Sequence, residues 1–322
     1  MSESVVRPRE QVFTTYVGLT AAGYDMACQS SRLVALIRDM SWPTDVVTYF
    51  REARMDGCLV NPYWPRSFLL TLASLYLPNS PPYRYADPEI IVRHIQGLDS
   101  ISPGHKGKET VRWILRLPVV YGLLRMEPVL DRLSKMYEAS IDFARCEQVL
   151  STAVSLVAER IGITPQALPN LIIVPNPLQA PEQTDFVELD GSTCLITAEP
   201  DVSSCIHELL HRILTPIIEL SRPKIDKSVH LLGPILGDML RLAYAWDESA
   251  QSWQRVFEEQ FIRAAETWVS CGDGSESSER AAMHADMGFR YVPAIVRQFQ
   301  TSFSGMGTME AFIADCLQTL GS

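Results

Sequence analysis

The sequence has few histidines, and none of its cysteines stand close enough together to share a site. Its 322 residues include six histidines and seven cysteines, and the C-x-x-C pattern does not occur. An odd number of widely spaced cysteines differs from a disulfide framework and from a cysteine zinc site. We therefore expect reduced thiols, which are typical of cytoplasmic proteins.

A basic excess and long apolar runs are also absent. The chain has 28 lysines and arginines against 38 aspartates and glutamates, which gives a net charge of −10. A nucleic-acid binder needs a basic face to neutralise phosphates, so this class of partner is excluded. The apolar run over residues 213–220 is interrupted by Pro216 and Glu219, and it is much shorter than the roughly 20 residues of a membrane span. The first ten residues lack the apolar stretch of a secretory signal, so we expect a soluble cytoplasmic protein.

Most of the chain has the apolar spacing of helices. Apolar residue types make up 47% of it, which is enough for a sizeable core. Residues 1–25 are mixed and polar without a clear period, and we expect a loose leading segment there. Helices are expected where apolar residues recur every three or four positions and where caps or prolines mark the ends. These ranges are residues 27–40, 44–54, 68–77, 109–125 and 127–160, the last of them broken once.

Strand patterns occur only in a short stretch in the middle of the chain. The apolar run of residues 171–174 lies between prolines and predicts a buried strand. Residues 185–189 and 193–197 flank Asp190-Gly191, a pair typical of a hairpin turn. Asp201 can then cap a helix. The chain is predicted to be α+β and predominantly α-helical, with a small β-sheet before this helix. Later helices are expected over residues 229–246, 249–270, 279–300 and 308–319.

The helix after Asp201 contains the pattern H-E-x-x-H as His207-Glu208-Leu209-Leu210-His211. A spacing of four residues puts both imidazoles on one face, where they can bind the same Zn²⁺. Glu208 is rotated by about 100° from His207, which suits a base acting on water at the metal rather than a ligand. The alternative is a buried helix whose histidines are satisfied by carbonyl groups or water. Two unpaired imidazoles on an apolar helix are costly, which favours the metal site.

A catalytic zinc ion usually takes three protein ligands and leaves one position for water. The compact pattern H-E-x-x-H-x-x-G-x-x-H is absent, because Leu214 and Ile217 stand at its glycine and its third histidine. Residues 256–266 are a better source of the third ligand, because carboxylates are set among apolar side chains there. A carboxylate in a packed helix needs a cation or a metal ion to neutralise it. Glu259 is the first candidate and Glu258 is the alternative.

An H-E-x-x-H motif with a glutamate on a later helix resembles the gluzincin metallopeptidases, which are thermolysin-like enzymes in the broad sense. The run from Glu259, Glu-Gln-Phe-Ile-Arg-Ala, is similar to the E-x-x-[IV]-R-A element of a bacterial HExxH domain family. The resemblance covers about residues 165–300 and implies a zincin-like fold. It also implies that His207, His211 and Glu259 hold the zinc ion and that Glu208 is the base.

We expect the chain to divide into a helical N-terminal region (residues 1–126) and a zincin-like metallopeptidase domain (residues 127–322). One position departs from the family pattern. Thermolysin-like enzymes have an aspartate four residues after the ligand glutamate, where this chain has Arg263. Arg263 can orient the ligand, bind a substrate carboxylate, or form an ion pair with Glu266 or Glu258.

The function implied by the resemblance is that of a zinc metallopeptidase, a hydrolase acting on peptide or protein substrates. Glu208 would accept a proton from water and pass it to the leaving amine. The developing oxyanion needs a further donor, for which Tyr291 is the first candidate and His284 and Arg263 are the others. The strand at residues 193–197 can pair with an extended peptide and present it to the metal. The alternative is a non-catalytic zincin-like module that binds metal or a partner protein.

Overall fold

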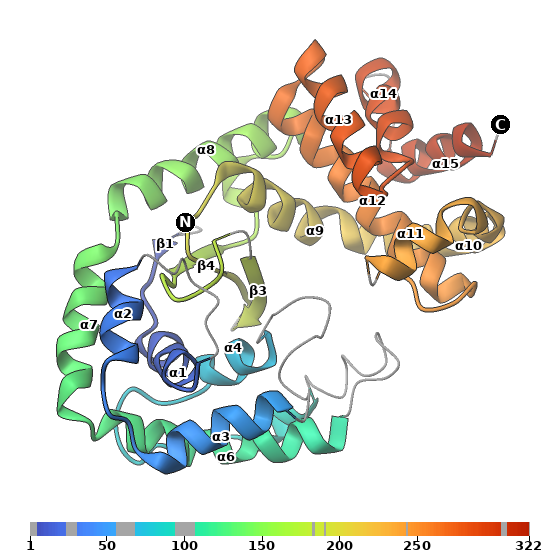
Figure 1. Ribbon diagram of the computed structural model, residues 1–322. Coiled ribbons are helices and arrows are strands. Elements are labelled where there is room, and N and C mark those ends of the chain that lie inside the picture. Colours follow the sequence, from blue (N-terminus) through green and yellow to red (C-terminus); the bar gives the residue numbers. More distant parts are fainter. Residues whose placement is uncertain are drawn as a thin grey trace. The chain divides into compact units, whose positions relative to one another are not determined.

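A computed structural model gives the fold of the chain (Figure 1). The described residues form a predominantly helical protein with one small β-sheet, as the sequence predicts. The residues that it describes are 5–23, 31–55, 68–93, 107–181, 184–189, 191–242, 244–303 and 308–321.

The chain folds into two compact units. One, called the sheet unit, contains Ser4–Glu147 and Leu171–Pro200. The other, called the site unit, contains Gln148–Asn170 and Asp201–Ser322. This division differs from the predicted boundary between residues 126 and 127, because the strands in the middle of the chain share a core with the N-terminal helices.

Four strands form the sheet in the order β1-β2-β4-β3. β2 (Leu171–Pro175) is buried at every position and lies parallel to β1 (Val5–Val6) and to β4 (Ser192–Thr197). β3 (Thr184–Leu189) pairs antiparallel with β4, so the predicted hairpin is confirmed. Gly191, at the start of the returning strand, has a φ of 75°, which favours glycine.

Because β4 is an interior strand, the prediction that it receives a peptide is wrong. Its backbone pairs with β2 on one side and with β3 on the other. An extended peptide adds only to a free strand edge, so residues 193–197 cannot present a substrate in this way. The turn residues predict that β4 pairs with β3, but no sequence pattern predicts its parallel pairing with β2.

The helices of the sheet unit share one apolar core with β2 and β4. Tyr137 illustrates the packing: its ring stacks on Phe13 with centroids 4.4 Å apart, and its hydroxyl donates to the Pro175 carbonyl at 2.7 Å. The helices are α1 (Glu10–Ala21), α2 (Arg32–Arg38), α3 (Thr44–Met55), α4 (Phe68–Leu75), α6 (Gly107–Arg125), α7 (Pro128–Ser140) and the start of α8 (Phe143–Ile161). The helix predicted over residues 127–160 with one break corresponds to α7 and α8, and the break lies between them.

The prediction of a loose segment over residues 1–25 is wrong where the structure describes it. β1 joins the sheet, and α1 is buried at every position from Gln11 to Thr20. A helix that is buried on all sides has no polar face, and hence no period to detect in the sequence. Its polar side chains are satisfied locally, since Thr15 and Thr20 donate at 2.9 Å to carbonyls four residues earlier.

The site unit is helical in its described residues. Aromatic side chains hold its later helices together, with Phe299 lying 5.1 Å from Trp268 and 4.6 Å from Phe312 between ring centroids. After the end of α8, its helices are α9 (Val202–Leu220), α10 (Arg222–Lys227), α11 (Leu236–Arg241), α12 (Ala250–Cys271), α13 (Ser275–Met287), α14 (Val292–Ser302) and α15 (Met309–Leu320).

Two of the predicted helices are interrupted. Residues 229–246 form two short 3-10 turns and α11, because Pro234 has no N–H to continue a helical ladder. Residues 279–300 are divided between α13 and α14 by Gly288, whose φ of 118° ends α13 in a left-handed cap. The turn at Gly288 lies against the end of α11, where Arg241 donates to the Met287 carbonyl at 3.1 Å.

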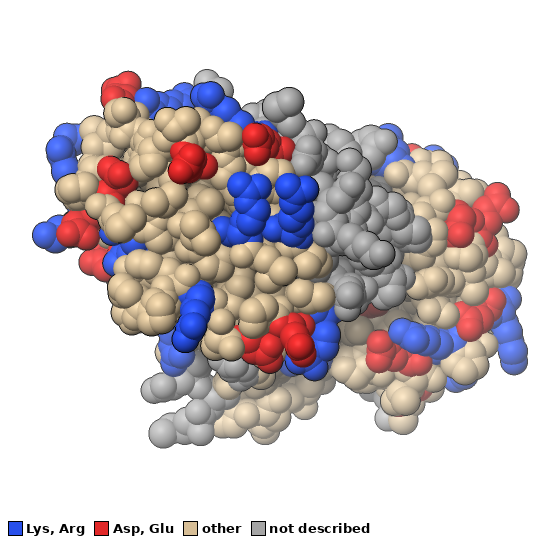
Figure 2. Space-filling view, turned by 90° about the horizontal axis from the view of Figure 1, so that it is seen from below, with Lys and Arg blue, Asp and Glu red and all other residues tan. Residues whose placement is uncertain are grey.

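The described helices and cysteines agree with what the composition predicts. Within the described part of the chain, every helix is too short or too polar to cross a membrane. The five cysteines that the structure describes are free thiols. Figure 2 shows acidic and basic side chains interspersed on one face, with uncharged surface between them.

Candidate metal centre

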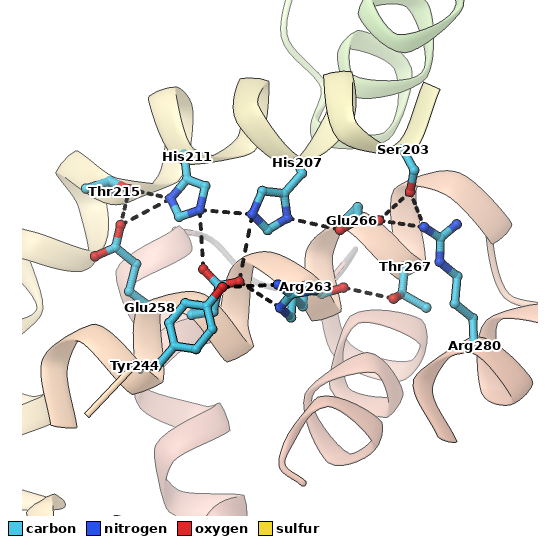
Figure 3. Close-up of polar contacts among 11 residues, drawn as sticks. Ser203, His207, His211, Thr215, Tyr244, Glu258, Arg263, Glu266, Thr267 and Arg280 are labelled. Atoms are coloured by element: carbon cyan, nitrogen blue, oxygen red, sulfur yellow. Dashed lines mark hydrogen bonds and ion pairs between the residues drawn. The ribbon is translucent and has the colours of Figure 1, made fainter. Parts of the chain in front are cut away.

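The H-E-x-x-H motif lies in the first half of α9, and a side-chain cap fixes the start of this helix. Asp201 accepts a hydrogen bond from the backbone N–H of Ser204 at 2.9 Å, as predicted. Most apolar side chains of α9 are buried. The polar ones recur every four positions and therefore form a stripe along one side of the helix (Figure 3). The stripe consists of Ser203, His207, His211 and Thr215.

This stripe faces α12, which packs against α9. His207 contacts Glu266, in the later part of α12. His211, one turn further along α9, contacts Glu258, two turns earlier in α12, so the two helices run in opposite directions here. We call the facing side chains the polar seam. It consists of Ser203, His207, His211 and Thr215 of α9 and of Glu258, Glu259 and Glu266 of α12.

Both histidines turn their Nδ1 atoms towards carboxylates. His207 Nδ1 lies 3.0 Å from Glu266 Oε2, and His211 Nδ1 lies 3.3 Å from Glu258 Oε1. An ionised carboxylate only accepts hydrogen bonds, so each Nδ1 is the donor. The two Nε2 atoms are left 3.2 Å apart and point towards one another (Figure 3). If both Nε2 atoms lack a proton, two lone pairs face each other, and a proton or a metal ion between them removes the repulsion.

Glu259 completes a triangle with the two Nε2 atoms. Its Oε1 lies 3.9 Å from His207 Nε2, and its Oε2 lies 3.7 Å from His211 Nε2. A tetrahedral zinc ion with bonds of about 2.0–2.1 Å places its nitrogen and oxygen ligands about 3.3 Å apart. The three donors therefore have the chemistry and the spacing that can hold a metal ion. Glu258 instead supports His211 from the far side of its ring.

Arg263 fixes Glu259 from behind, one turn further along α12. Its Nε lies 2.7 Å from Glu259 Oε1, so orienting the predicted ligand is the role that its contacts support. The guanidinium also lies 4.1 Å above the Phe289 ring and donates from Nη2 to the Tyr244 hydroxyl at 3.3 Å. Burial opposes ionisation of Glu259, but the charges of Arg263 and the two histidines outweigh it and hold the pKa of Glu259 far below its usual range.

The charges around the polar seam do not balance without a cation. The four carboxylates are Glu208, Glu258, Glu259 and Glu266, and the two guanidinium groups are Arg263 and Arg280. The carboxylates therefore exceed the guanidinium groups by two, and a divalent metal ion would neutralise this excess. Burial lowers the pKa of His211, but hydrogen bonds to Glu258 and Glu259 outweigh it and raise this pKa to about 10. Metal binding must therefore displace protons.

Glu208 lies beside the three donors rather than among them. Its side chain is buried on α9, and its charge lies close enough to His211 to help raise the pKa of that residue. The structure thus places a carboxylate near the metal site without using it as a donor atom. The role of Glu208 as a base stays a prediction.

Two of the predicted oxyanion donors, Tyr291 and His284, have no hydrogen bond to a residue of the polar seam in the part of the chain that the structure describes. The Tyr291 hydroxyl donates to the Leu231 carbonyl at 2.6 Å, and its ring packs on Trp253. None of its contacts joins it to the polar seam, so the contacts do not support that role. His284 is buried on α13, and neither of its ring nitrogens has a hydrogen-bond partner within the described residues.

The sequence did not single out several residues that the structure brings to the seam. Ser203 and Thr215 were detectable, because they continue the four-residue spacing of the two histidines. Tyr244 was not, because it reaches Arg263 from the irregular segment before α12. Glu266 follows Glu259 by two helical turns, so both lie on the same face of α12. This spacing identifies Glu266 as a partner of His207 only once the packing of α9 on that face is known.

The metal centre predicts different effects for two adjacent glutamates. We expect the chain to bind one zinc ion and Glu259→Ala to weaken binding more than the 10- to 100-fold loss that is typical for outer partners. Glu258→Ala, which removes only the support of His211, should lose no more than this range. Zinc content by elemental analysis and zinc affinity by dye competition measure both. The reverse order would make Glu258 the third ligand.

A second prediction concerns acid stability. Burial lowers the pKa of His284 from 6.5 to about 4, with Arg263 acting in the same direction and Glu266 against it. Between these values the unfolded chain binds a proton that the folded chain excludes, so stability falls as the pH falls from 6.5 towards 4. His284→Gln should lose less stability than the wild type between pH 7 and pH 5, measured by urea unfolding in chelator.

The exposed His230 provides the control for this measurement, since His230→Gln makes the same change on the surface of the same unit. It should leave the pH dependence of unfolding as in the wild type. An unchanged pH dependence in His284→Gln would show that His284 takes up its proton equally in the folded and unfolded chains.

Comparisons with protein-family models, with curated proteins and with solved structures found no match for this chain. The likeness to the gluzincins therefore stays a prediction from its two motifs. Any function proposed for the chain rests on the geometry and chemistry of the polar seam.

Proposed function

We propose that this chain is a zinc-dependent metallopeptidase. The observation that carries the proposal is the triangle formed by the Nε2 atoms of His207 and His211 and the carboxylate of Glu259. Two imidazoles and one carboxylate are the donor set of many catalytic zinc sites, whereas structural zinc sites use four protein ligands. The same donors can bind Fe²⁺ in oxygenases, but a buried carboxylate between the two histidines in the sequence favours hydrolysis.

The chain's own residues divide the work of hydrolysis between them. Zinc, when bound, would lower the pKa of water to about 7 and polarise the scissile carbonyl. Glu208 takes the proton from the attacking water and passes it to the leaving amine. Glu266 and Glu258 hold the two histidines by their Nδ1 atoms, so that both rings keep their orientation during turnover.

Tyr244 is the donor that best suits the developing oxyanion. Its hydroxyl lies 3.3 Å from Arg263 Nη2, which also holds the ligand Glu259. Burial and the charge of Glu259 raise the pKa of Tyr244 to about 12. The phenol therefore keeps its proton at neutral pH, and its hydroxyl lies in contact with both Glu259 and Arg263, beside the proposed metal donors. We propose Tyr244 in the place that the sequence gave to Tyr291.

The proposed base leads to a direct test. Glu208→Gln should keep its zinc and lose roughly 100-fold or more in kcat/KM on a peptide library, because the amide cannot accept a proton. Glu219→Gln is the matched control, since Glu219 is an exposed glutamate on the same helix and pairs with Arg222. It should cleave as the wild type does. Full cleavage by Glu208→Gln would remove Glu208 as the base.

A second function is favoured by the burial of the site between two helices. The histidine side chains are only 16% and 20% exposed, and a metal ion there would tie α9 to α12. A non-catalytic module would use the metal to support its fold. In that case the wild type and Glu208→Gln would both fail to cleave any peptide, and chelation would lower the melting temperature of both.

A further inference from the structure

The polar seam continues beyond the metal donors to an arginine on a third helix. Glu266, which accepts from His207 Nδ1, has its other carboxylate oxygen 2.6 Å from Arg280 Nη2. Ser203, on the first turn of α9, donates to this same oxygen and accepts from Arg280. Arg280 belongs to α13, and Figure 3 shows it closing the end of the seam next to Ser203 and Glu266.

The two carboxylates that hold the histidines have different surroundings. Glu266 is only 7% exposed at its side chain and is paired with Arg280. Glu258 is 26% exposed, and its described partners are His211 and Thr215, without any arginine or lysine. Solvent can reach Glu258, so its side chain is freer to change rotamer. Glu266 is held in place by His207, Ser203 and Arg280. His207 is therefore the more firmly held of the two imidazoles.

The chemistry of arginine suits this position. A guanidinium is planar and carries its donors in a rigid fork, so one group can contact a carboxylate and a hydroxyl together. Its charge also neutralises Glu266, whose other partners are His207 and Ser203. A buried carboxylate without a cation would turn or move towards water, and His207 would lose its support.

We propose that Arg280 is a positioning residue of the metal centre, acting through Glu266 on His207. Arg280 and Ser203 hold the carboxylate, the carboxylate fixes the ring of His207 with Nδ1 as donor, and Nε2 then faces the metal position. The proposal rests on the metal site of the proposed function but not on hydrolysis. It also makes α13, which supplies none of the three metal donors, sensitive to whether metal is bound.

Zinc affinity tests the proposal with a matched pair of arginines. Arg280→Gln should weaken zinc binding about tenfold or more in dye competition, within the range for outer partners of metal ligands. Arg290→Gln breaks an equally short pair in the same unit, 2.7 Å from Asp238, which touches no metal donor. It should bind zinc as the wild type does. Equal affinities for both variants and the wild type would overturn the proposal.

Ser203→Ala is a milder variant in case Arg280→Gln fails to fold. It removes one contact to Glu266 and one to Arg280 without leaving a buried charge unpaired. Zinc affinity should fall a few-fold, and unchanged affinity would contradict the proposal. A wild-type chain that binds no zinc would overturn the metal site and this proposal together. A chain that binds zinc without cleaving peptides would overturn only the proposed enzyme.

Hydrogen exchange distinguishes positioning from a purely structural role. Zinc should slow the exchange of backbone amides in α13 (Ser275–Met287) in the wild type and in Arg290→Gln. The effect should be lost in Arg280→Gln, because the connection between α13 and His207 is cut. An arginine that only stabilises the fold would change exchange in α13 equally with and without zinc, and that result would contradict the coupling.

Discussion

Two imidazole nitrogens that face each other at 3.2 Å are the constraint on which the rest of the site depends. Each histidine already uses its Nδ1 as a donor to a glutamate, so neither has a proton to spare for the other without becoming charged. The two lone pairs repel unless a proton or a metal ion lies between them. Glu259 adds a third donor on the same side. The antiparallel packing of α9 on α12 makes these contacts possible, because one helix supplies the histidines and the other supplies the carboxylates for both sides of their rings.

Arginines at the edge of the polar seam hold the glutamates that contact the two histidines. Arg263, which lies on the Phe289 ring, holds the proposed ligand Glu259, while Arg280 holds the carboxylate behind His207. Each arginine meets a buried glutamate that would otherwise carry an uncompensated charge. The Arg263–Glu259 and Arg280–Glu266 pairs would hold the proposed metal donors in position without a metal ion. The loss of side-chain entropy on metal binding would then be smaller. His211, supported by the more exposed Glu258, is the less constrained side of the triangle.

The sequence predicted the part of this site that depends on local spacing. The four-residue interval between the histidines placed both rings on one face of α9, and the apolar surroundings of Glu259 marked a packed helix. It could not predict Glu266 or Arg280 as partners of His207, because these contacts depend on how three helices pack. The contact of the Tyr291 hydroxyl with the Leu231 carbonyl was equally beyond prediction, since a hydroxyl finds its partner only in the folded chain. In the fold, the hairpin was predicted from its turn, but α1 was missed because a fully buried helix has no polar face.

X-ray absorption at the zinc edge of the purified, zinc-loaded protein tests the central claim most directly, because it reports which atoms surround the metal. The account predicts nitrogen and oxygen neighbours at about 2.0–2.1 Å, with the outer scattering of two imidazole rings. In Glu259→Ala the imidazole scattering should persist while the site loses an oxygen neighbour or most of its metal. A sulfur shell at about 2.3 Å, or the scattering of fewer than two imidazoles, would contradict it.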